Sequence, residues 1–148
     1  MAVDQQYTGR VYPPTAPFEV GREKIREFAE SINDANPVYR DAAAARALGY
    51  DDVIAPPTFA IVITLPAGHQ VIEDPDLGID YSRVVHGEQR FVHRRPIRAG
   101  DVLQAVVTIE SIRAAAGNDM VSTRADVKTL DGEDVLTAYA TLVARGTA

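Results

Sequence analysis

The stretch Thr58-Phe-Ala-Ile-Val-Ile-Thr-Leu-Pro-Ala-Gly-His-Gln-Val-Ile72 is apolar over most of its length. Its apolar residues follow no period that separates a buried helix from a buried strand. The segment is nevertheless longer than a typical strand, which favours a helix. We therefore predict a buried helix over 58–72, kinked or restarted at Pro66 and Gly68, because proline removes a helix donor.

The sequence after this segment has the character of β-strands. The clearest alternation of apolar and polar residues runs over 102–113 and places four apolar residues on one face: Leu103, Ala105, Val107 and Ile109. Further strands are predicted over 84–95, 120–129 and 135–144. Turns are predicted at 96–101, around Gly117-Asn118 and at Asp131-Gly132, a strong hairpin signal. Together these segments predict an antiparallel meander.

The sequence before the apolar segment predicts a short strand at 18–20 and two helices. Apolar residues spaced for one helical face indicate a helix over 22–32. A second helix is predicted over 41–48, with Asp41 as its N-cap and Gly49 as its stop. A long buried helix followed by a sheet that wraps it is an α+β architecture of the hot-dog type, and residues 1–148 fit one such domain.

The composition excludes several classes of function. The chain carries a formal net charge of −6, which disfavours nucleic-acid binding because phosphate neutralisation needs a basic face. It has no cysteine, so disulfides and thiolate metal sites are excluded, and no metal site or cofactor is expected. Residues 1–9 do not resemble a signal peptide, and the apolar run 60–65 is too short to span a bilayer. We expect a cytoplasmic protein without membrane contact.

The stretch Asp34-Ala-Asn-Pro-Val-Tyr39 is the most informative for function. On its own it could simply stop a helix, with Asp34 and Asn36 satisfying backbone groups. It also resembles the signature of (R)-specific enoyl hydratases and MaoC-like dehydratases, Asp-x-Asn-Pro-(Ile/Val/Leu)-His, in which the Asp and His act on a thioester substrate. Tyr39 occupies the histidine position, and a phenol with an ordinary pKa near 10 is a poor base at neutral pH.

Four further segments extend the resemblance over nearly the whole chain: Val20–Ala29, Leu48-Gly49-Tyr50, Ala55-Pro-Pro-Thr-Phe59 and Pro96-Ile-Arg-Ala-Gly-Asp101. In order and spacing they resemble the actinobacterial MaoC dehydratase N-terminal (UPF0336) family. That family includes the non-catalytic subunits of mycobacterial (3R)-hydroxyacyl-ACP dehydratases. The resemblance implies that this chain shapes an acyl tunnel and pairs with a hot-dog subunit that carries the Asp and His.

His86 and Glu88 are a second candidate site. Residues two apart on a strand share a face, so the pair could act as acid and base, or could belong to a solvated or interface face. Arg90, Arg94, Arg95 and Arg98 crowd the following segment. They could form a charged strand edge or a patch for the phosphates of coenzyme A or for acyl carrier protein.

We therefore predict a component of a (3R)-hydroxyacyl-thioester dehydratase that binds acyl-CoA or acyl-ACP. It is expected to be inactive alone and to form a homodimer or a heterodimer with a catalytic hot-dog subunit. Asp34, Asn36 and Tyr39 would be a vestigial motif. The expected substrate-binding residues are Pro57, Phe59, Ile61, His86, Gln89, Arg94 and Arg95. Two alternatives stay open: an acyl-binding scaffold without turnover, and a homodimeric hydratase or thioesterase that uses Asp34, His86 or Glu88.

Overall fold

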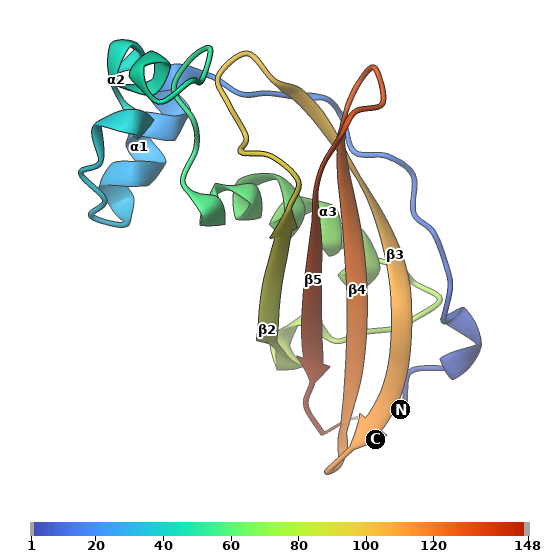
Figure 1. Cartoon of the computed structure of the whole chain (residues 1–148). Helices are drawn as coiled ribbons and strands as arrows, with labels where there is room; N and C mark the ends of the chain where they lie inside the picture. Colours follow the sequence, from blue (N-terminus) through green and yellow to red (C-terminus); the bar gives the residue numbers. More distant parts are fainter. Residues whose placement is uncertain (1, 147–148) are drawn as a thin grey trace.

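A five-stranded antiparallel sheet curls around one helix in the computed structural model, which describes residues 2–146 (Figure 1). The strands are β1 (Phe18–Glu19), β2 (Val84–His93), β3 (Val102–Ala115), β4 (Asn118–Thr129) and β5 (Asp134–Ala144). The helices are α1 (Arg22–Ser31), α2 (Ala42–Ala47) and α3 (Ile61–Ile72). Short 3₁₀ turns lie at Gln5–Tyr7, Pro37–Tyr39, Pro57–Ala60 and Tyr81–Arg83. The α+β hot-dog architecture is confirmed.

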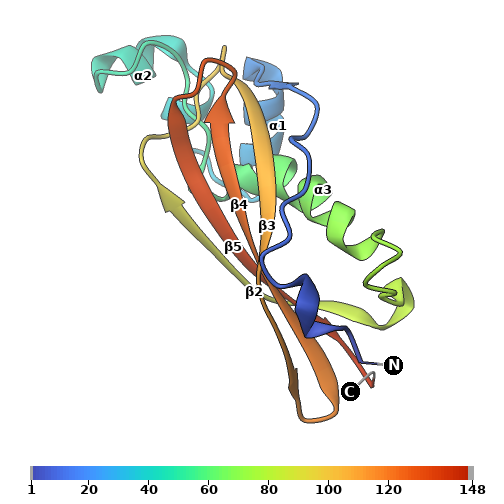
Figure 2. The ribbon, with the colours of Figure 1, turned by 90° about the vertical axis from the view of Figure 1, so that its right-hand side faces the viewer.

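The sheet buries its concave face against α3, as the view from the side shows (Figure 2). The four alternating apolar residues of β3, from Leu103 to Ile109, are all at most 1% exposed, which confirms the predicted face. Ile63, Ala67 and Val71 of α3 are buried as well. At the start of this helix Phe59 is fully buried and packs edge-on against Phe28 of α1, with ring centroids 5.5 Å apart.

The prediction allowed α3 either to kink or to restart, and a restart is ruled out. The helix continues from Ile61 to Ile72 through both Pro66 and Gly68. Pro66 lies on the exposed side of the helix, where water can bind the carbonyl group that lost its donor. Within the described part of the chain, no helix is long and apolar enough to cross a bilayer.

The predicted four-stranded meander was also wrong in one respect, because β2 is not next to β3. The strand order is β1-β3-β4-β5-β2, so β2 pairs with β5 and ends the sheet. The connection from β2 to β3 forms hydrogen bonds with the segment before α3: Ala55 N donates to Ile97 O, and Ala99 N donates to Val53 O. Because residues 53–55 take up this connection, it cannot fold back as a hairpin.

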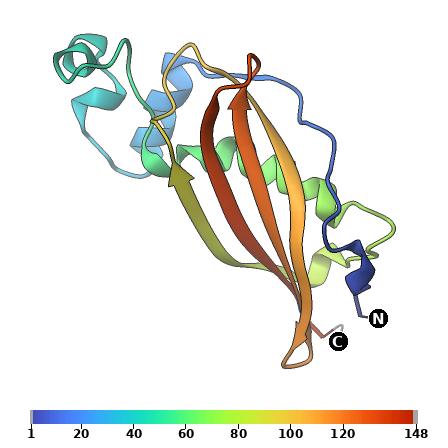
Figure 3. The same cartoon turned by 45° about the vertical axis from the view of Figure 1, so that its right-hand side comes forward.

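The two long edges of the sheet differ. The N-terminal arm runs along β3, where the backbone N–H groups of Gly9, Tyr12 and Thr15 donate to β3 carbonyls. Figure 3 shows this arm beside β3, with α1 and α2 projecting beyond one end of the sheet. No strand of residues 2–146 lies beyond β2 at the other edge. One edge is therefore covered by the chain itself, and the other is available to another chain.

Candidate functional site

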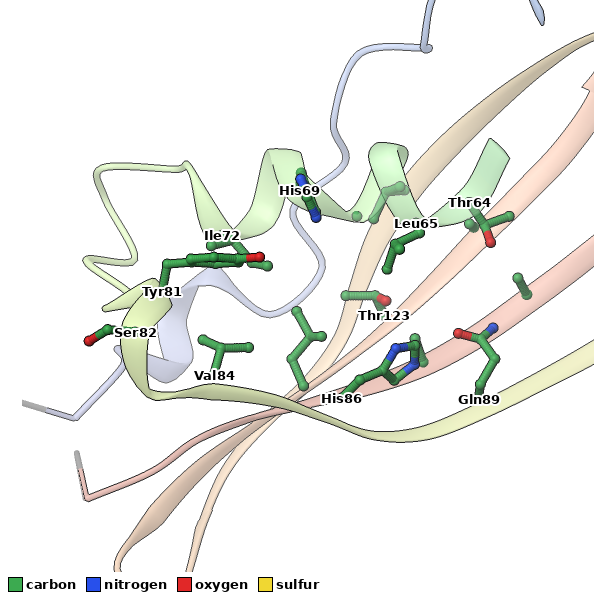
Figure 4. Close-up of a pocket in the computed structure, with 16 residues that line it drawn as sticks. Thr64, Leu65, His69, Ile72, Tyr81, Ser82, Val84, His86, Gln89 and Thr123 are labelled. Carbon is green, nitrogen blue, oxygen red and sulfur yellow. The ribbon is translucent and has the colours of Figure 1, made fainter. Parts of the chain in front are cut away.

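A groove lies between α3 and the concave face of the sheet, and we call it the α3 groove (Figure 4). Its volume is about 420 Å³. The helix and the segment after it contribute Thr64, Leu65, Gly68, His69, Ile72, Tyr81 and Ser82. The strands contribute Val84, His86, Gln89, Val107, Thr123, Ala125, Ala138, Ala140 and Leu142.

The groove exists because the facing residues are small. Ala125 of β4 pairs with Ala138 of β5, and Ala140 is the next groove-lining residue along β5. On the helix, Gly68 lines the groove without a side chain, and a Cβ added there would meet nothing within 4 Å. Larger side chains at these positions would occupy the space between helix and sheet.

A β-bulge at Gly87 decides which side chains of β2 enter the groove. His86 pairs with Leu142 and Glu88 with Thr141, so Gly87 is an extra residue in the strand. A Cβ added at Gly87 would lie 3.0 Å from Val143 Cγ2, a tight contact that favours glycine there. The expectation that His86 and Glu88 share a face was therefore wrong. His86 and Gln89 line the groove, whereas Glu88 lies on the opposite face.

The bulge separates the imidazole of His86 from the carboxylate of Glu88. The contact between the two residues is made instead by the His86 Nε2–H, which donates to the Glu88 backbone carbonyl at 3.1 Å. Glu88 lines a small hollow on the convex face together with Arg90 and Tyr139. This geometry does not support His86 and Glu88 as an acid/base pair for a ligand in the groove.

The Asp-x-Asn-Pro-x-Tyr motif forms a self-contained loop over residues 33–40, which we call the motif loop. Asp34 Oδ1 accepts a hydrogen bond from Asn36 N at 3.1 Å, and Asn36 Oδ1 accepts one from Val38 N at 3.1 Å. Burial and the charge of Asp34 raise the pKa of the Tyr39 phenol above its usual value. At neutral pH Tyr39 therefore keeps its proton and cannot act as a base.

Tyr39 opens onto a second hollow of about 370 Å³, which we call the motif pocket. Its lining residues are Tyr39, Ile54, Ala55, Pro57, His93, Arg94, Arg95 and Pro96. The pocket thus brings together four of the site residues predicted from the sequence: Tyr39, Pro57, Arg94 and Arg95. It also contains His93, which sequence reasoning missed. The His93 Nε2–H donates to the Pro57 carbonyl at 2.8 Å, a contact between distant segments that no local pattern reveals.

The four arginines of the predicted cluster are mostly engaged by other side chains. Arg95 donates to both carboxylate oxygens of Asp101 at 2.9 Å and also pairs with Glu133, which lowers the pKa of the Glu133 carboxyl. Arg94 donates to Thr137 Oγ1, and Arg90 stacks over the ring of Tyr139 on the convex face. Arg98 lies 4.0 Å from the same Asp101 carboxylate, so Arg94, Arg95 and Arg98 stay near one another and Arg90 lies apart from them.

Two expected substrate-binding residues lie outside the lining of both hollows. Phe59 is 0% exposed and belongs to the core beneath α1. Ile61 is half-buried and, by helical spacing, lies on the same side of α3 as Leu65 and Gly68, one turn before the groove. The described residues contain no group of three or more His, Asp and Glu side chains that could hold a metal ion.

Known proteins are similar to this chain in sequence and in architecture. A family model described as FAS1-like, dehydratase domain region matches residues 6–138. The chain belongs to this FAS1-like dehydratase family. A UPF0336 protein of Saccharopolyspora erythraea is 60% identical over 148 residues, which cover 100% of this chain and 95% of that protein. The family resemblance seen in the sequence is therefore confirmed.

Two solved structures extend the comparison for this FAS1-like dehydratase member. One is the HadBC (3R-hydroxyacyl-ACP dehydratase) complex from Mycobacterium tuberculosis, with 37% identity, a TM-score of 0.82, and coverage of 93% of this chain and 96% of that chain. The other is a MaoC-like dehydratase, with 37% identity and a TM-score of 0.87. The alignment covers 94% of this chain but only 42% of that one, so a single hot-dog unit accounts for less than half of the larger protein.

Proposed function

We propose that this chain is the acyl-binding subunit of a (3R)-hydroxyacyl-thioester dehydratase in fatty-acid metabolism, and that a second hot-dog chain supplies the acid and the base. The substrate would be an acyl-CoA or acyl-ACP thioester in the cytoplasm. The observation that carries the proposal is the α3 groove, an open and mainly apolar hollow of about 420 Å³ within a dehydratase-family fold. Pockets of this size and character are typical of small-molecule sites.

The complete enzyme would remove water reversibly from a 3-hydroxyacyl thioester. A base takes the proton from Cα, an acid protonates the hydroxyl on Cβ, the C–O bond breaks, and the electron pair at Cα forms the double bond as water leaves. In this chain Asp34 bonds to its own loop and Tyr39 retains its proton. A tyrosine that retains its proton cannot supply the base, so we assign proton abstraction to the partner chain. We assign protonation of the hydroxyl to the partner as well, because the family signature carries its Asp and His together on one chain, and we assign acyl binding to this one.

The open edge of the sheet supports the need for a partner. Val85 and Val92 of β2 are each 40% exposed on the face opposite the groove, and Leu65 and Tyr81, which line the groove, are 45% and 65% exposed. Exposed apolar side chains beside an unpaired strand are typical of an interface. A second hot-dog chain that extends the sheet from β2 would cover them and close the side of the α3 groove. The HadBC relative is itself a complex, which agrees with this arrangement.

The test is to narrow the groove without changing the rest of the sheet. We expect Ala140→Leu to weaken binding of a long-chain acyl-CoA, measured by calorimetric titration. Displacing about three methylene groups, each worth about 0.8 kcal/mol, predicts a loss of roughly 50-fold. Thr141→Leu is the matched control, because the next residue of β5 points to the opposite face.

Equal affinities for the wild type and Ala140→Leu would show that the acyl chain does not lie in the groove. A similar loss in Thr141→Leu would point to a general disturbance of β5, and would likewise contradict groove binding. Both variants should retain the melting temperature of the wild type within a few degrees, because Ala140 and Thr141 are only partly buried.

A further inference from the structure

Three side chains tie the N-terminal arm to the segment that follows α3, and we call them the arm clamp: Arg10, Tyr12 and Asp74. The Tyr12 hydroxyl donates to Asp74 Oδ2 at 2.7 Å, and Arg10 Nη1 donates to the same oxygen at 2.8 Å. The other carboxylate oxygen, Asp74 Oδ1, accepts a hydrogen bond from Asp76 N at 3.0 Å. The arm and the segment after α3 lie side by side at this point (Figure 3).

The arm clamp is buried and charged. The side chain of Asp74 is 8% exposed, and Tyr12 is 9% exposed. Burial by itself would raise the pKa of the Asp74 carboxyl, but the hydrogen bonds from Tyr12 and Arg10 outweigh it and leave the pKa below its ordinary value. Asp74 is therefore a carboxylate at neutral pH. Hydrogen bonds to a charged group are stronger than neutral ones, so the clamp attaches the two segments firmly.

The arm clamp fixes one end of the α3 groove. Ile72, the last residue of α3, and Tyr81 both line the groove, and Asp74 belongs to the short segment that joins them. The arm itself is fixed to the sheet, since the backbone N–H of Tyr12 donates to the Val107 carbonyl of β3 at 2.9 Å. The clamp therefore connects this end of α3 to the β3 edge of the sheet.

The position of the helix shows what this connection does to the groove. α3 packs against β3 and β4. The strand residues that line the groove come mainly from β2, β4 and β5. The helix thus lies over the β3 side of the sheet, and the groove opens on the β2 side. An open groove leaves apolar surface in water, so burial of that surface favours movement of the helix toward β2. The clamp opposes this movement, because it holds the end of α3 at the opposite edge.

The other end of the groove is the one nearer the motif pocket. Thr64, in the first turn of α3, lines the groove there, across from Ile72 and Tyr81 (Figure 4). The motif pocket includes Pro57, shortly before α3, and His93, which ends β2. A ligand whose thioester faced the motif pocket would place only the end of a long tail against Ile72 and Tyr81.

We propose that the arm clamp holds the α3 groove open, and that Tyr12 and Asp74 are positioning residues that determine how long an apolar tail the groove accepts. A site that is already held in its binding shape loses less free energy to ordering when the ligand enters, and binds it more tightly. The effect falls on long tails, because short ones do not reach the clamped end. This inference rests on the proposed function, since it assumes that the groove holds an acyl chain.

The experiment measures how affinity depends on tail length in the wild type and in Asp74→Asn. Hexanoyl-CoA and dodecanoyl-CoA compete with a fluorescent acyl-CoA bound to the full chain in its native assembly. Asp74→Asn keeps the shape of the side chain and removes its charge. We expect it to weaken binding of dodecanoyl-CoA roughly tenfold, the effect of losing charge-assisted hydrogen bonds, and binding of hexanoyl-CoA by less than about twofold.

Tyr12→Phe is a milder second variant, which removes one hydrogen bond and leaves the pair of Arg10 and Asp74 in place. It should show the same selectivity at roughly threefold, and it keeps the test decisive if Asp74→Asn does not fold. Asp52→Asn is the matched control, because Asp52 also pairs with an arginine, Arg22 at the start of α1, but lies outside the groove. It should leave the ratio of the two affinities unchanged.

An equal loss for both ligands in the clamp variants would indicate a general disturbance and overturn the role of the clamp. Unchanged affinities in both clamp variants would overturn it as well, and would leave the acyl groove intact. A changed ratio in Asp52→Asn would show that the selectivity does not depend on the clamp. If neither thioester bound to the wild type, the proposed function would fall together with this inference.

A second measurement needs no variant. Coupling between two sites is reciprocal, so a tail that reaches the clamped end should slow amide hydrogen exchange in the arm. We expect saturating dodecanoyl-CoA to protect residues 9–12 of the wild type more strongly than saturating hexanoyl-CoA. Equal protection by the two ligands would contradict a connection between the groove and the arm.

Discussion

The motif loop and the α3 groove both gather polar side chains, but they differ in how those side chains are satisfied. In the motif loop, Asp34 and Asn36 accept hydrogen bonds from their own backbone, and Arg40 donates to the Asp34 carbonyl. In the groove, Thr64 and Gln89 each present an atom without a partner in the described chain. Polar groups that bond within their own loop stabilise its turn, and the unpartnered atoms of the groove take no part in such bonds. We expect the motif loop to serve the local structure, and under the proposed function we assign acyl binding to the α3 groove.

Removing a satisfied, buried polar group should destabilise the chain. The strongest case is Asp101, whose carboxylate is 6% exposed and receives Arg95 at both oxygens and the Arg98 N–H. Asp101→Ala leaves the Arg95 guanidinium without its buried partner, and breaking a buried pair typically costs about 3–5 kcal/mol. Urea denaturation of the two proteins would measure the difference.

Glu110→Ala is the matched control, because Glu110 and Arg124 form an ion pair with both side chains 37% exposed. Exposed pairs contribute about 0–1 kcal/mol, so this variant should stay close to the wild type. Comparable losses of unfolding free energy in Asp101→Ala and Glu110→Ala would contradict the view that the buried pair stabilises the fold more than the exposed pair.

The two edges of the sheet offer the next test. Val85→Lys places a charge beside the open β2 edge and should weaken self-association or partner binding by roughly 100-fold, about 2.7 kcal/mol. Val11→Lys is the control, since Val11 is 60% exposed on the arm that covers the β3 edge. Sedimentation velocity across a concentration series measures both. An assembly equally sensitive to both lysines, or to neither, would show that β2 is not the interface.

The smallest expected effect concerns the motif loop itself. Asp34→Ala removes one turn-forming hydrogen bond, which should lower the free energy of unfolding by about 1 kcal/mol. Turnover by an assembled complex should change less than twofold, because we expect the carboxylate to serve geometry alone. Thermal melting and a steady-state assay of the same preparation give both numbers. If turnover vanished while the melting temperature stayed unchanged, Asp34 would be a catalytic residue.

Local patterns in the sequence predicted the helices and strands, but not which of them pair or pack together. The alternation from Leu103 to Ile109 and the Asp41 cap are local signals, and each predicted its element within a few residues. The pairing of β2 with β5 depends on residues far apart, so no local pattern could give it. The glycine at position 87 was a readable sign of a bulge, because an isolated glycine in a strand often marks one. The hydrogen-bond status of Thr64 and Gln89 requires coordinates.

The central claim is that this chain holds the acyl group while another chain performs the proton transfers. The most direct measurement is hydration of a trans-2-enoyl-CoA by the purified chain alone and by the assembly isolated with its native hot-dog partner. We expect the chain alone to be slower by a factor of about 10²–10⁴, the usual loss when an acid/base group is missing. Turnover by the chain alone at the rate of the assembly would contradict the proposed division of labour.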